Sequence, residues 1–442
     1  MYFRKSSLFW LFAIVIFLIP TSGCIDDREQ MLPVSAEVTS PSQIGEWLEQ
    51  LRAIIRATNT SGAEASRILA YSSIAYYQGY SLGFADMRSL VGQLEGLDEL
   101  PSPNPNQTYN YGVIAESAMT TTLLRLFEDE PQNIQLVISS TYSDHEREYI
   151  KLGVAESVVS RSRALGEVIG EAIKVWMDGD GYAELANCSI TIPSEAGNWV
   201  PTPTAFSEAE FPCWGNLRAF TFSEDQLIAL CHPGIPEEVS SQAGSTYDNE
   251  INELVSINQS LTASQEETAL FWEDKDGSFT VPGHYMNILK QLVGQNLLDG
   301  KQTVTAWTQL CIAMADTYIS TYKLKYTYFR PRPLTVVQNN SDPNWESFSL
   351  NPATPEYPSM RSTIAYASTQ VFINLYGDIA FTDGTYSNIG LAERSYASFN
   401  EMSAEVAESR LLAGTNLRTT LENSEYHGRC IAQRANELFL NQ

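Results

Sequence analysis

Basic residues and histidine are both scarce in this chain. Its 442 residues include 53 acidic residues against 27 lysines and arginines, only four histidines, and a formal charge of -26. A surface of that sign repels phosphate backbones, so we do not expect nucleic acid as a partner. The few cations are therefore informative, because a cluster of them would attract a small anion through an acidic shell.

Apolar runs long enough to cross a bilayer are also missing. Leu8 to Ile19 follows two basic residues and is too short to span, which is typical of a secretory signal. Thr21-Ser22-Gly23-Cys24 is similar to a bacterial lipobox, whose cysteine carries the lipid; ordinary cleavage nearby is the alternative. We expect a signal peptide over residues 1–24, a membrane anchor at Cys24, and a polar linker over residues 25–40 outside the cytoplasm.

Cysteine is rare as well. Five cysteines follow Cys24, and an odd number outside the cytoplasm leaves at least one unpaired. We expect one disulfide among Cys188, Cys213 and Cys231, which lie in the turn-rich middle of the chain. Cys311 and Cys430 lie in helical patterns and are expected to be small core residues. No cysteine or histidine spacing is typical of zinc, so no metal ligands are predicted.

Helical periodicity dominates the rest of the chain, and no stretch is typical of a strand ladder. We predict an all-α protein of two packed helical bundles, at about residues 41–180 and 240–442, with loops over about 182–235 between them. Ser143 with Glu146, and Ser264 with Glu267, match the helix-capping pattern. Helices are expected from Pro41 and over Ala65–Tyr80, Tyr111–Phe127, Ser143–Met177, Ser240–Ile257, Thr262–Trp272, Tyr285–Leu298 and Val304–Tyr326.

Cations gather in the stretch from Tyr322 to Pro333, where a helical pattern ends in two prolines. A lysine followed seven residues later by an Arg-Pro pair occurs twice there, as Lys323 with Arg330 and as Lys325 with Arg332. Residues seven apart lie on one helix face, so either pair could face one ligand. A lone pair of this kind is more often a solvated helix end.

Two later segments change that interpretation. They are Glu356-Tyr357-Pro358-Ser359-Met360-Arg361-Ser362-Thr363 and Ser409-Arg410-Leu411-Leu412-Ala413-Gly414-Thr415-Asn416. With the lysine and arginine stretch they resemble the three-part signature of the vanadium-dependent haloperoxidases and type 2 phosphatidic acid phosphatases, Lys-x6-Arg-Pro, Pro-Ser-Gly-His and Ser-Arg-x5-His. The resemblance covers nearly the whole mature chain and implies one haloperoxidase-like domain over residues 41–442, with an anion site in its C-terminal bundle.

Four residues match the family positions that bind vanadate or phosphate oxygens. The surrounding sequence favours Lys325 and Arg332 over the pair two residues earlier, and Ser359 and Arg410 complete the set. Guanidinium groups donate in a fork that matches oxyanions, and lysine adds a point charge. Ser359 is at an expected helix start, where free N–H groups favour anions. The resemblance therefore implies a small anionic ligand, vanadate or phosphate.

Both family histidines are replaced. Arg361 occupies the position of the histidine that moves protons, and Asn416 that of the histidine that is the axial vanadium ligand or the phosphoryl acceptor. Asn416 cannot form phosphohistidine and is a poor metal ligand, while Arg361 stays protonated. Met360 replaces a glycine, which predicts a narrower pocket. Thr420 stands where a carboxylate often supports the axial histidine, which predicts that this support is lost too.

His284 is the one candidate for a substitute acid or base, and the alternative is a buried structural histidine. His427 would lie about 16 Å along a helix from Asn416, out of reach. We therefore expect an anion-binding homologue with impaired catalysis. The alternatives are an active haloperoxidase or acid-phosphatase-like enzyme with altered ligation or using His284, and a structural lipoprotein with no deep cationic pocket.

Overall fold

The computed structural model describes residues 41–274, 278–295, 298–438 and 440. The predicted signal peptide, Cys24 and the linker over residues 25–40 lie outside this part of the chain. The described residues are all-α as predicted, apart from one two-stranded antiparallel ladder. Within the same ranges, no helix combines the length and apolar character that a bilayer span needs.

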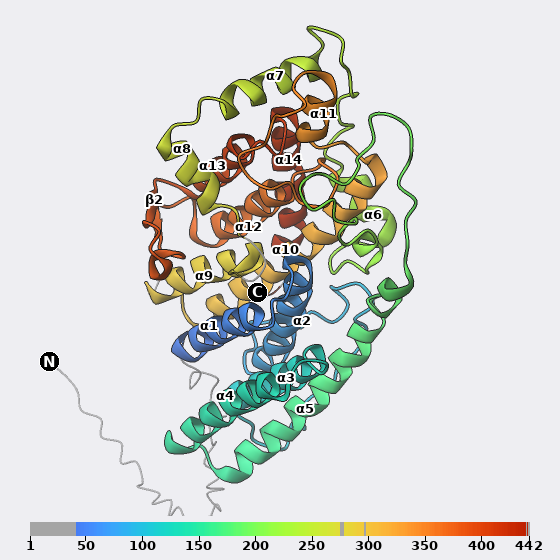
Figure 1. The fold of residues 1–442 in the computed structure, drawn as a ribbon. Coiled ribbons are helices and arrows are strands. Elements are labelled where there is room, and N and C mark those ends of the chain that lie inside the picture. The colour runs from blue at the N-terminus through green and yellow to red at the C-terminus, as the bar shows by residue number, and fades with distance from the viewer. Residues whose placement is uncertain (1–40, 275–277, 296–297, 439, 441–442) are drawn as a thin grey trace, which may run out of the picture. The chain divides into compact units, whose positions relative to one another are not determined.

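The N-terminal helices form the first part of the fold (Figure 1). A capping box between Ser61 and Glu64 opens the second of them. The third helix packs against the second and the fifth. Their bounds are α1 Pro41–Ala57, α2 Gly62–Ser81, α3 Tyr111–Leu126, α4 Gln132–Lys151 and α5 Glu156–Asp178.

The predicted single helix from Ser143 to Met177 is wrong. Residues 132–151 form α4, with Ile134, Ile138 and Tyr142 buried at a spacing of four. Gly153 then takes a positive φ of 97°, which breaks the helix before α5 begins. The Ser143 hydroxyl, placed inside α4, donates to a main-chain carbonyl one turn earlier instead of capping a helix.

The middle of the chain is mostly irregular and contains short helices. They are η2 Ala183–Asn187, η3 Trp214–Asn216 and α6 Glu224–Cys231. A Cβ on Gly215 would lie 2.5 Å from the Lys323 Cα, so glycine permits η3 to lie directly against a later helix. This contact brings the Phe211 ring within 5.7 Å of the Tyr322 ring.

The C-terminal part carries the remaining helices. The predicted capping pair of Ser264 and Glu267 is wrong, since Thr262 and Gln265 form the box two residues earlier. The three-residue strands were too short for the sequence pattern to predict. The elements are α7 Thr246–Asn258, α8 Ala263–Phe271, α9 Thr280–Gly294, α10 Gly300–Tyr328, α11 Pro333–Asn340, α12 Met360–Tyr376, β1 Phe381–Asp383, η4 Ser387–Ile389, β2 Arg394–Tyr396, α13 Phe399–Leu412 and α14 Arg418–Asn436.

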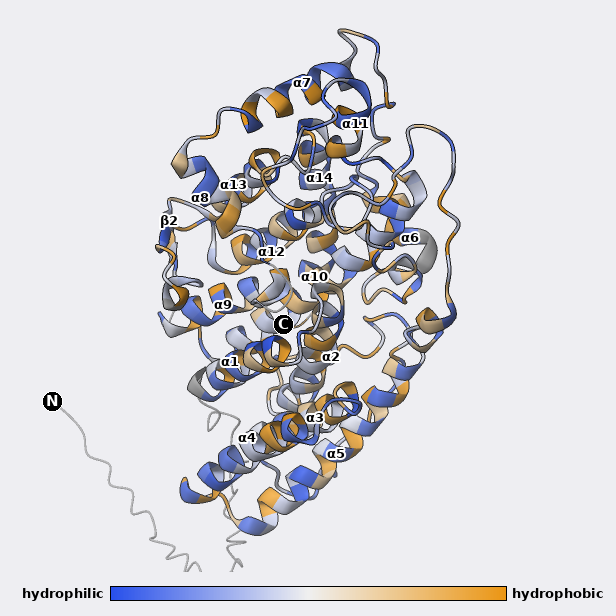
Figure 2. Ribbon diagram, in the orientation of Figure 1, coloured by the Kyte–Doolittle hydropathy of each residue, from blue (hydrophilic) through white to orange (hydrophobic). Residues whose placement is uncertain are grey.

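Helix α10 is the central element of the fold. It packs against α2 on one side and α12 on the other, and its residues are buried almost without break from Thr303 to Leu324. One apolar core extends from Ile44 on α1 to Leu440, so the N-terminal and C-terminal helices share it. Hydrophilic and hydrophobic residues alternate along α5 and α7, as expected for helices with one solvent-facing side (Figure 2).

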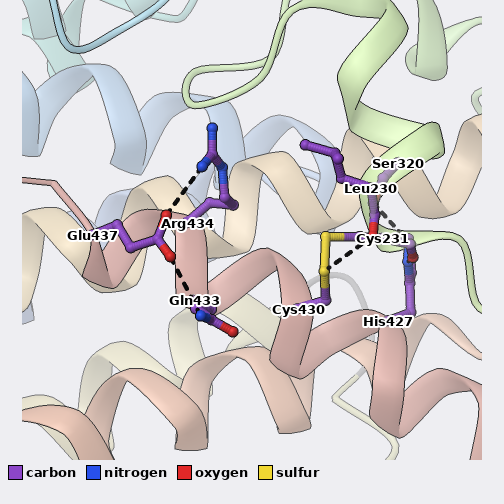
Figure 3. Close-up of a disulfide and its surroundings, with 8 residues drawn as sticks. All are labelled: Leu230, Cys231, Ser320, His427, Cys430, Gln433, Arg434 and Glu437. Atoms are coloured by element: carbon purple, nitrogen blue, oxygen red, sulfur yellow. Dashed lines mark hydrogen bonds and ion pairs between the residues drawn. A yellow bond between two sulfur atoms is a disulfide. The ribbon is translucent and has the colours of Figure 1, made fainter.

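The described residues contain two disulfides. Cys188 pairs with Cys213, which confirms the predicted bond within the middle segment, and Cys311 is free and buried as expected. The prediction that Cys430 is a small core residue like Cys311 is wrong, because Cys430 bonds Cys231 and joins α6 to α14 (Figure 3). The two cysteines are 199 residues apart, and no local pattern reports such a pairing.

His427 lies beside this second disulfide and is fixed there (Figure 3). Its Nδ1 donates to the Cys231 carbonyl at 2.6 Å, and its Nε2 accepts from the Ser320 hydroxyl at 3.0 Å. Burial lowers the pKa of His427 to about 4, so the ring is neutral at ordinary pH. It is a structural residue of the α6–α14 junction.

Candidate active site

The predicted site residues of the three motif segments line one cavity of about 280 Å³, and His284 does not. It lies between the end of α10, the start of α12, the end of α13 and a loop over residues 349–354. Of the predicted residues, its lining includes Lys325, Arg332, Ser359, Met360, Arg361, Arg410 and Asn416. Segments up to 91 residues apart in the sequence therefore converge on one space.

The end of α10 positions the first two cations. Phe329 takes a left-handed conformation with φ 47°, and its N–H donates to the Lys325 carbonyl, so the helix stops one turn after Lys325. Arg332 then occupies the N-cap position of α11, whose first residue is Pro333. Both cationic side chains are 2% exposed.

Main-chain carbonyls orient these two cations. Lys325 Nζ donates to the Pro355 carbonyl at 2.7 Å. Arg332 Nε donates to the Thr354 carbonyl at 2.8 Å, and its Nη1 donates to the Thr415 carbonyl at 3.1 Å. Both cations thus donate to neutral acceptors, so these hydrogen bonds do not neutralise their charges, although the nearby Glu356 carboxylate attracts both.

The start of α12 supplies two more lining residues. Ser359 is the N-cap of α12, and its N–H donates to the Ser424 hydroxyl of α14 at 3.0 Å. The two helices approach closely because Gly428 has no Cβ, which would lie 2.2 Å from the Thr363 carbonyl oxygen. Arg361, in the first turn, is half-buried, and its Nε donates to the Glu273 carbonyl at 2.8 Å.

Helix α13 supplies the last cation near its end. Arg410 is buried, with Nε 3.0 Å from the Ser409 hydroxyl and Nη2 donating to the Ala269 carbonyl at 3.1 Å. A turn at Gly414, with φ 75°, then returns the chain so that Asn416 also faces the cavity.

The four cations have no ion-pair partner within the described residues, although other side chains of this chain do. Burial lowers the pKa of Arg332 to about 10 and that of Arg410, helped by Arg361, to about 9. Burial and the charge of Arg332 also lower the pKa of Lys325 well below its ordinary value. The cavity therefore concentrates positive charge in a poorly solvated place.

Three acidic residues also line the cavity, namely Glu210, Glu273 and Asp274. Asp274 is already paired with His284 through a 2.8 Å contact to Nδ1, and the Tyr386 hydroxyl donates to the same oxygen. Asp274 is thus hydrogen-bonded to these two side chains rather than to a cation, and its charge still acts on Arg410.

Glu356 is the site residue that the sequence did not reveal. Its buried carboxylate accepts from Asn416 Nδ2 at 2.9 Å and from the Thr420 hydroxyl at 2.9 Å. The prediction that no carboxylate supports position 416 is therefore wrong, because Glu356 supplies it from across the fold. Burial raises the pKa of Glu356. Glu356 stands inside a motif segment, but nothing local indicates its partner 60 residues away.

His284 does not line the cavity. It is fully buried, its Nδ1 lies 2.8 Å from Asp274, and its Nε2 lies 2.7 Å from Asp383 on β1. Burial acts to lower its pKa, but the two carboxylates outweigh this effect and raise it to about 10. Both ring nitrogens are engaged, which favours the structural alternative. Within the described residues, no histidine lines the cavity.

Aromatic and amide side chains complete the lining. Phe211, Tyr318 and Tyr322 line the cavity, and the two tyrosine rings are stacked 6.2 Å apart on α10. Ser349 and Asn351 belong to the lining loop, and the sequence analysis did not select any of these residues. Their side chains become neighbours of the cations only through the packing of loops on α10.

Comparisons with known proteins agree with this geometry. Residues 305–441 match a family model for the second helical-bundle domain of VCPO. The crystal structure of a bacterial vanadium-dependent iodoperoxidase is 28% identical, with a TM-score of 0.81, over 90% of this chain and 95% of that chain. No protein with a curated description matches by sequence.

Two further structures share the fold at lower identity. The holo form of a bacterial vanadium-dependent chloroperoxidase is 13% identical with a TM-score of 0.61, over 91% of this chain and 93% of that chain. The apo form is 12% identical with a TM-score of 0.62, over 93% and 95%. The C-terminal bundle of this chain thus matches the VCPO family model, and the fold of the described residues is similar to that of the vanadium-dependent haloperoxidases.

Proposed function

We propose that the cavity binds a small tetrahedral oxyanion, phosphate or vanadate, and that halide oxidation and phosphate-ester hydrolysis by this chain are slow or absent. One observation carries the proposal. Lys325, Arg332 and Arg410 are almost fully buried around one cavity, and only neutral groups accept from them. Burying a charge that is not bonded to an anion is costly even with carboxylates nearby, so a bound anion would stabilise all three.

The residues present suit an oxyanion but not a bond to a metal. Lys325, Arg332, Ser359 and Arg410 would bind the oxygens of vanadate, which supplies the centre for peroxide-dependent halide oxidation when bound in a haloperoxidase. Asn416 offers an amide where the family has an imidazole, and an amide is a poor transition-metal ligand. Arg361 offers a guanidinium group, which donates hydrogen bonds but is not suited to relaying a proton as an imidazole does.

The proposed setting is outside the cytoplasm, with the chain attached to a membrane through lipid at Cys24. The bonds Cys188–Cys213 and Cys231–Cys430 support export, because disulfides persist in oxidising compartments. The negative formal charge of the chain supports a small anion rather than nucleic acid as the partner. Acylation is checked by mass spectrometry of the mature protein, and an unmodified Cys24 would remove the anchor from the proposal.

Calorimetry with phosphate and with vanadate tests the binding. We expect Arg332→Ala and Arg410→Ala each to weaken binding by about tenfold or more, because each removes a buried charged donor. Arg147→Ala is the matched control, since Arg147 is exposed on α4 and pairs with Asp144. That variant should bind like the wild type.

Two results would overturn the proposal. One is the absence of binding, or binding that neither Arg332→Ala nor Arg410→Ala alters. The other is rapid turnover by the unmodified protein, either of bromide or iodide with vanadate and peroxide, or of a phosphate monoester. Because both nitrogens of His284 are engaged, no contact in the structure favours the working-enzyme alternative that uses it.

Anion binding should also take up a proton at Lys325. The pKa of this lysine is lowered when the cavity holds no anion, and a bound anion would raise it, so the bound form carries more protons at the same pH. The apparent affinity should accordingly fall as the pH rises. Calorimetry in two buffers with different heats of ionisation measures the uptake.

Lys325→Met provides the control for that measurement. It removes the titrating amine and retains much of its apolar volume, so the buffer dependence from this group should disappear. An unchanged proton uptake in Lys325→Met would assign the effect to another group.

A further inference from the structure

The cavity is larger than the anion that we propose for it. A tetrahedral oxyanion displaces roughly two or three waters, each of which takes up about 30 Å³. Such an anion would fill about a third at most of a cavity of about 280 Å³. The whole cavity is close in size to the smallest sites that enclose organic ligands. The remaining space is therefore large enough for a further part of the ligand.

Much of the remaining lining is apolar. Four apolar side chains that are partly or largely exposed line the cavity, namely Phe211, Leu350, Pro352 and Met360. Leu350 is 72% exposed. Covering apolar surface with an apolar group is favourable, because both are removed from water. This part of the cavity therefore suits a neutral, apolar group.

Aromatic rings continue this surface towards a cation. Phe211, Tyr318 and Tyr322, which we call the aromatic wall, line the cavity, and the Tyr322 ring is 5.7 Å from that of Phe211 and 6.2 Å from that of Tyr318. Tyr318, Tyr322 and Lys325 lie on one face of α10, because they are four and three residues apart. At a rise of about 1.5 Å per residue, Tyr322 is about 4.5 Å along the axis from Lys325. The aromatic wall thus begins about one turn from an amine that would bind the anion.

Main-chain hydrogen bonds hold the segment that carries Phe211. The N–H of Glu210 donates to the Ala353 carbonyl at 2.9 Å, and the Glu210 carbonyl accepts from the Tyr326 hydroxyl. Phe211 itself takes a φ of 49°, a conformation that is uncommon for a bulky residue. This part of the aromatic wall is thus preformed, so binding would cost little ordering of the segment.

A carboxylate disfavours a second anion in the remaining space. Glu210 lines the cavity and precedes Phe211 in the chain. Burial lowers the pKa of Arg332, while Glu210 acts to raise it, so the carboxylate lies close enough to Arg332 to interact with it. A second charged group beside the aromatic wall would be repelled by Glu210 and would lose hydration against apolar side chains. A neutral substituent avoids both costs.

We propose that the bound oxyanion is one end of an organic ligand, a phosphate monoester or phosphonate whose flat apolar ring packs against the aromatic wall. The inference rests on the proposed oxyanion binding and adds the chemical class of the ligand, which is bound intact. Lys325, Arg332 and Arg410 would bind the oxygens while the ring covers Phe211. A ring suits this surface better than a flexible chain, because rings pack favourably in stacked or edge-to-face arrangements.

Calorimetry on the full mature chain tests the inference with three phosphonates, whose carbon–phosphorus bond excludes ester hydrolysis. At a pH above the second ionisation of all three, phenylphosphonate, hexylphosphonate and methylphosphonate carry the same double charge. Phenylphosphonate should bind at least about tenfold more tightly than methylphosphonate, because its ring covers apolar surface and packs on Phe211. Hexylphosphonate has as many carbons in its substituent as phenylphosphonate, and should bind at least about threefold less tightly because its flexible chain loses rotamer freedom.

Variants of single rings locate the effect. Phe211→Ala should reduce the preference for phenylphosphonate over methylphosphonate to about threefold or less, with the affinity for methylphosphonate nearly unchanged. Phe206→Ala is the matched control, because Phe206 is in the same irregular segment, has the same φ of 49°, is 62% exposed and lies outside the cavity lining. That variant should keep the full preference. Tyr322→Leu removes a second ring of the aromatic wall and should also reduce the preference.

The outcomes separate this inference from the proposed function. If phosphate binds but phenylphosphonate binds no more tightly than methylphosphonate, the organic ligand is wrong while oxyanion binding stands. Equal binding of hexylphosphonate and phenylphosphonate would overturn the assignment of a ring. If neither phosphate nor any phosphonate binds, the proposed function fails and the inference fails with it. Should Phe211→Ala not fold, as judged by circular dichroism, Tyr322→Leu and the comparison of phosphonates on the wild type still decide.

Discussion

A variant that combines Met360→Gly, Arg361→His and Asn416→His is expected to oxidise iodide with vanadate and peroxide at least about a hundredfold faster than the wild type. General acid–base groups contribute about 10² to 10⁴ in rate, and none of the described residues that line the wild-type cavity is a histidine that could supply this. The cations that would bind vanadate oxygens already line the cavity, so only the replaced groups need restoring.

The position of Glu356 in the structure supports the expected gain in iodide oxidation. Its Oε1 lies 2.9 Å from Asn416 Nδ2, where it would accept from the imidazole of Asn416→His. A carboxylate behind a ligating histidine orients the ring and raises its basicity, and losing one costs about 10- to 100-fold in affinity or activity. Adding Glu356→Gln to the triple variant should therefore lower the gained activity by about that factor.

Steady-state iodide oxidation by the purified proteins measures the gain, and elemental analysis of the dialysed protein confirms bound vanadium. The double variant that combines Met360→Gly and Arg361→His, without Asn416→His, is the control. It should oxidise iodide only slightly faster than the wild type. A triple variant that binds vanadium but turns over at the wild-type rate would show that the three replaced groups do not explain the loss.

Replacing His284 by leucine is expected to lower the free energy of unfolding by about 3–5 kcal/mol. The ring lies between Asp274 and Asp383, at 2.8 Å and 2.7 Å, and is fully buried. Removing one member of a buried charged network leaves the others uncompensated, which accounts for the size of the loss. Urea unfolding monitored by circular dichroism at several pH values measures it.

The stabilisation of the fold by His284 should decrease as the pH rises. The pKa of His284 in the folded protein, about 10, is above the value of 6.5 for a free side chain. Its stabilisation is therefore fully present below pH 6.5 and is lost as the pH rises through about 10. The difference between wild type and His284→Leu should shrink over that range.

His232→Gln is the matched control for this prediction. His232 is half-buried and contacts the Tyr328 hydroxyl at 2.8 Å, with no carboxylate bound to its ring. Its replacement should cost about 1 kcal/mol or less. A His284→Leu variant that loses no more than this, or that has the same loss at every pH, would contradict the account of His284 as a buried charge partner.

The local parts of the site could be predicted from the sequence. The apolar periodicity indicated helices, and the repeated spacing of a lysine before an Arg-Pro pair indicated cations at a helix end. The family resemblance, rather than the spacing, selected Lys325 and Arg332. Ser359 at a helix start is also a local feature, and the structure places it as the N-cap of α12. Such features depend on residues within one or two helical turns, whose geometry is nearly the same in every protein.

Tertiary packing alone decided the rest. The pairing of Glu356 with Asn416, the position of His284 between two carboxylates, and the bond from Cys231 to Cys430 join residues that are 10 to 199 apart in sequence. Periodicity shows which face of a helix is buried, but it does not identify the group on the facing element. The direction of the Asn416 amide follows from that facing group.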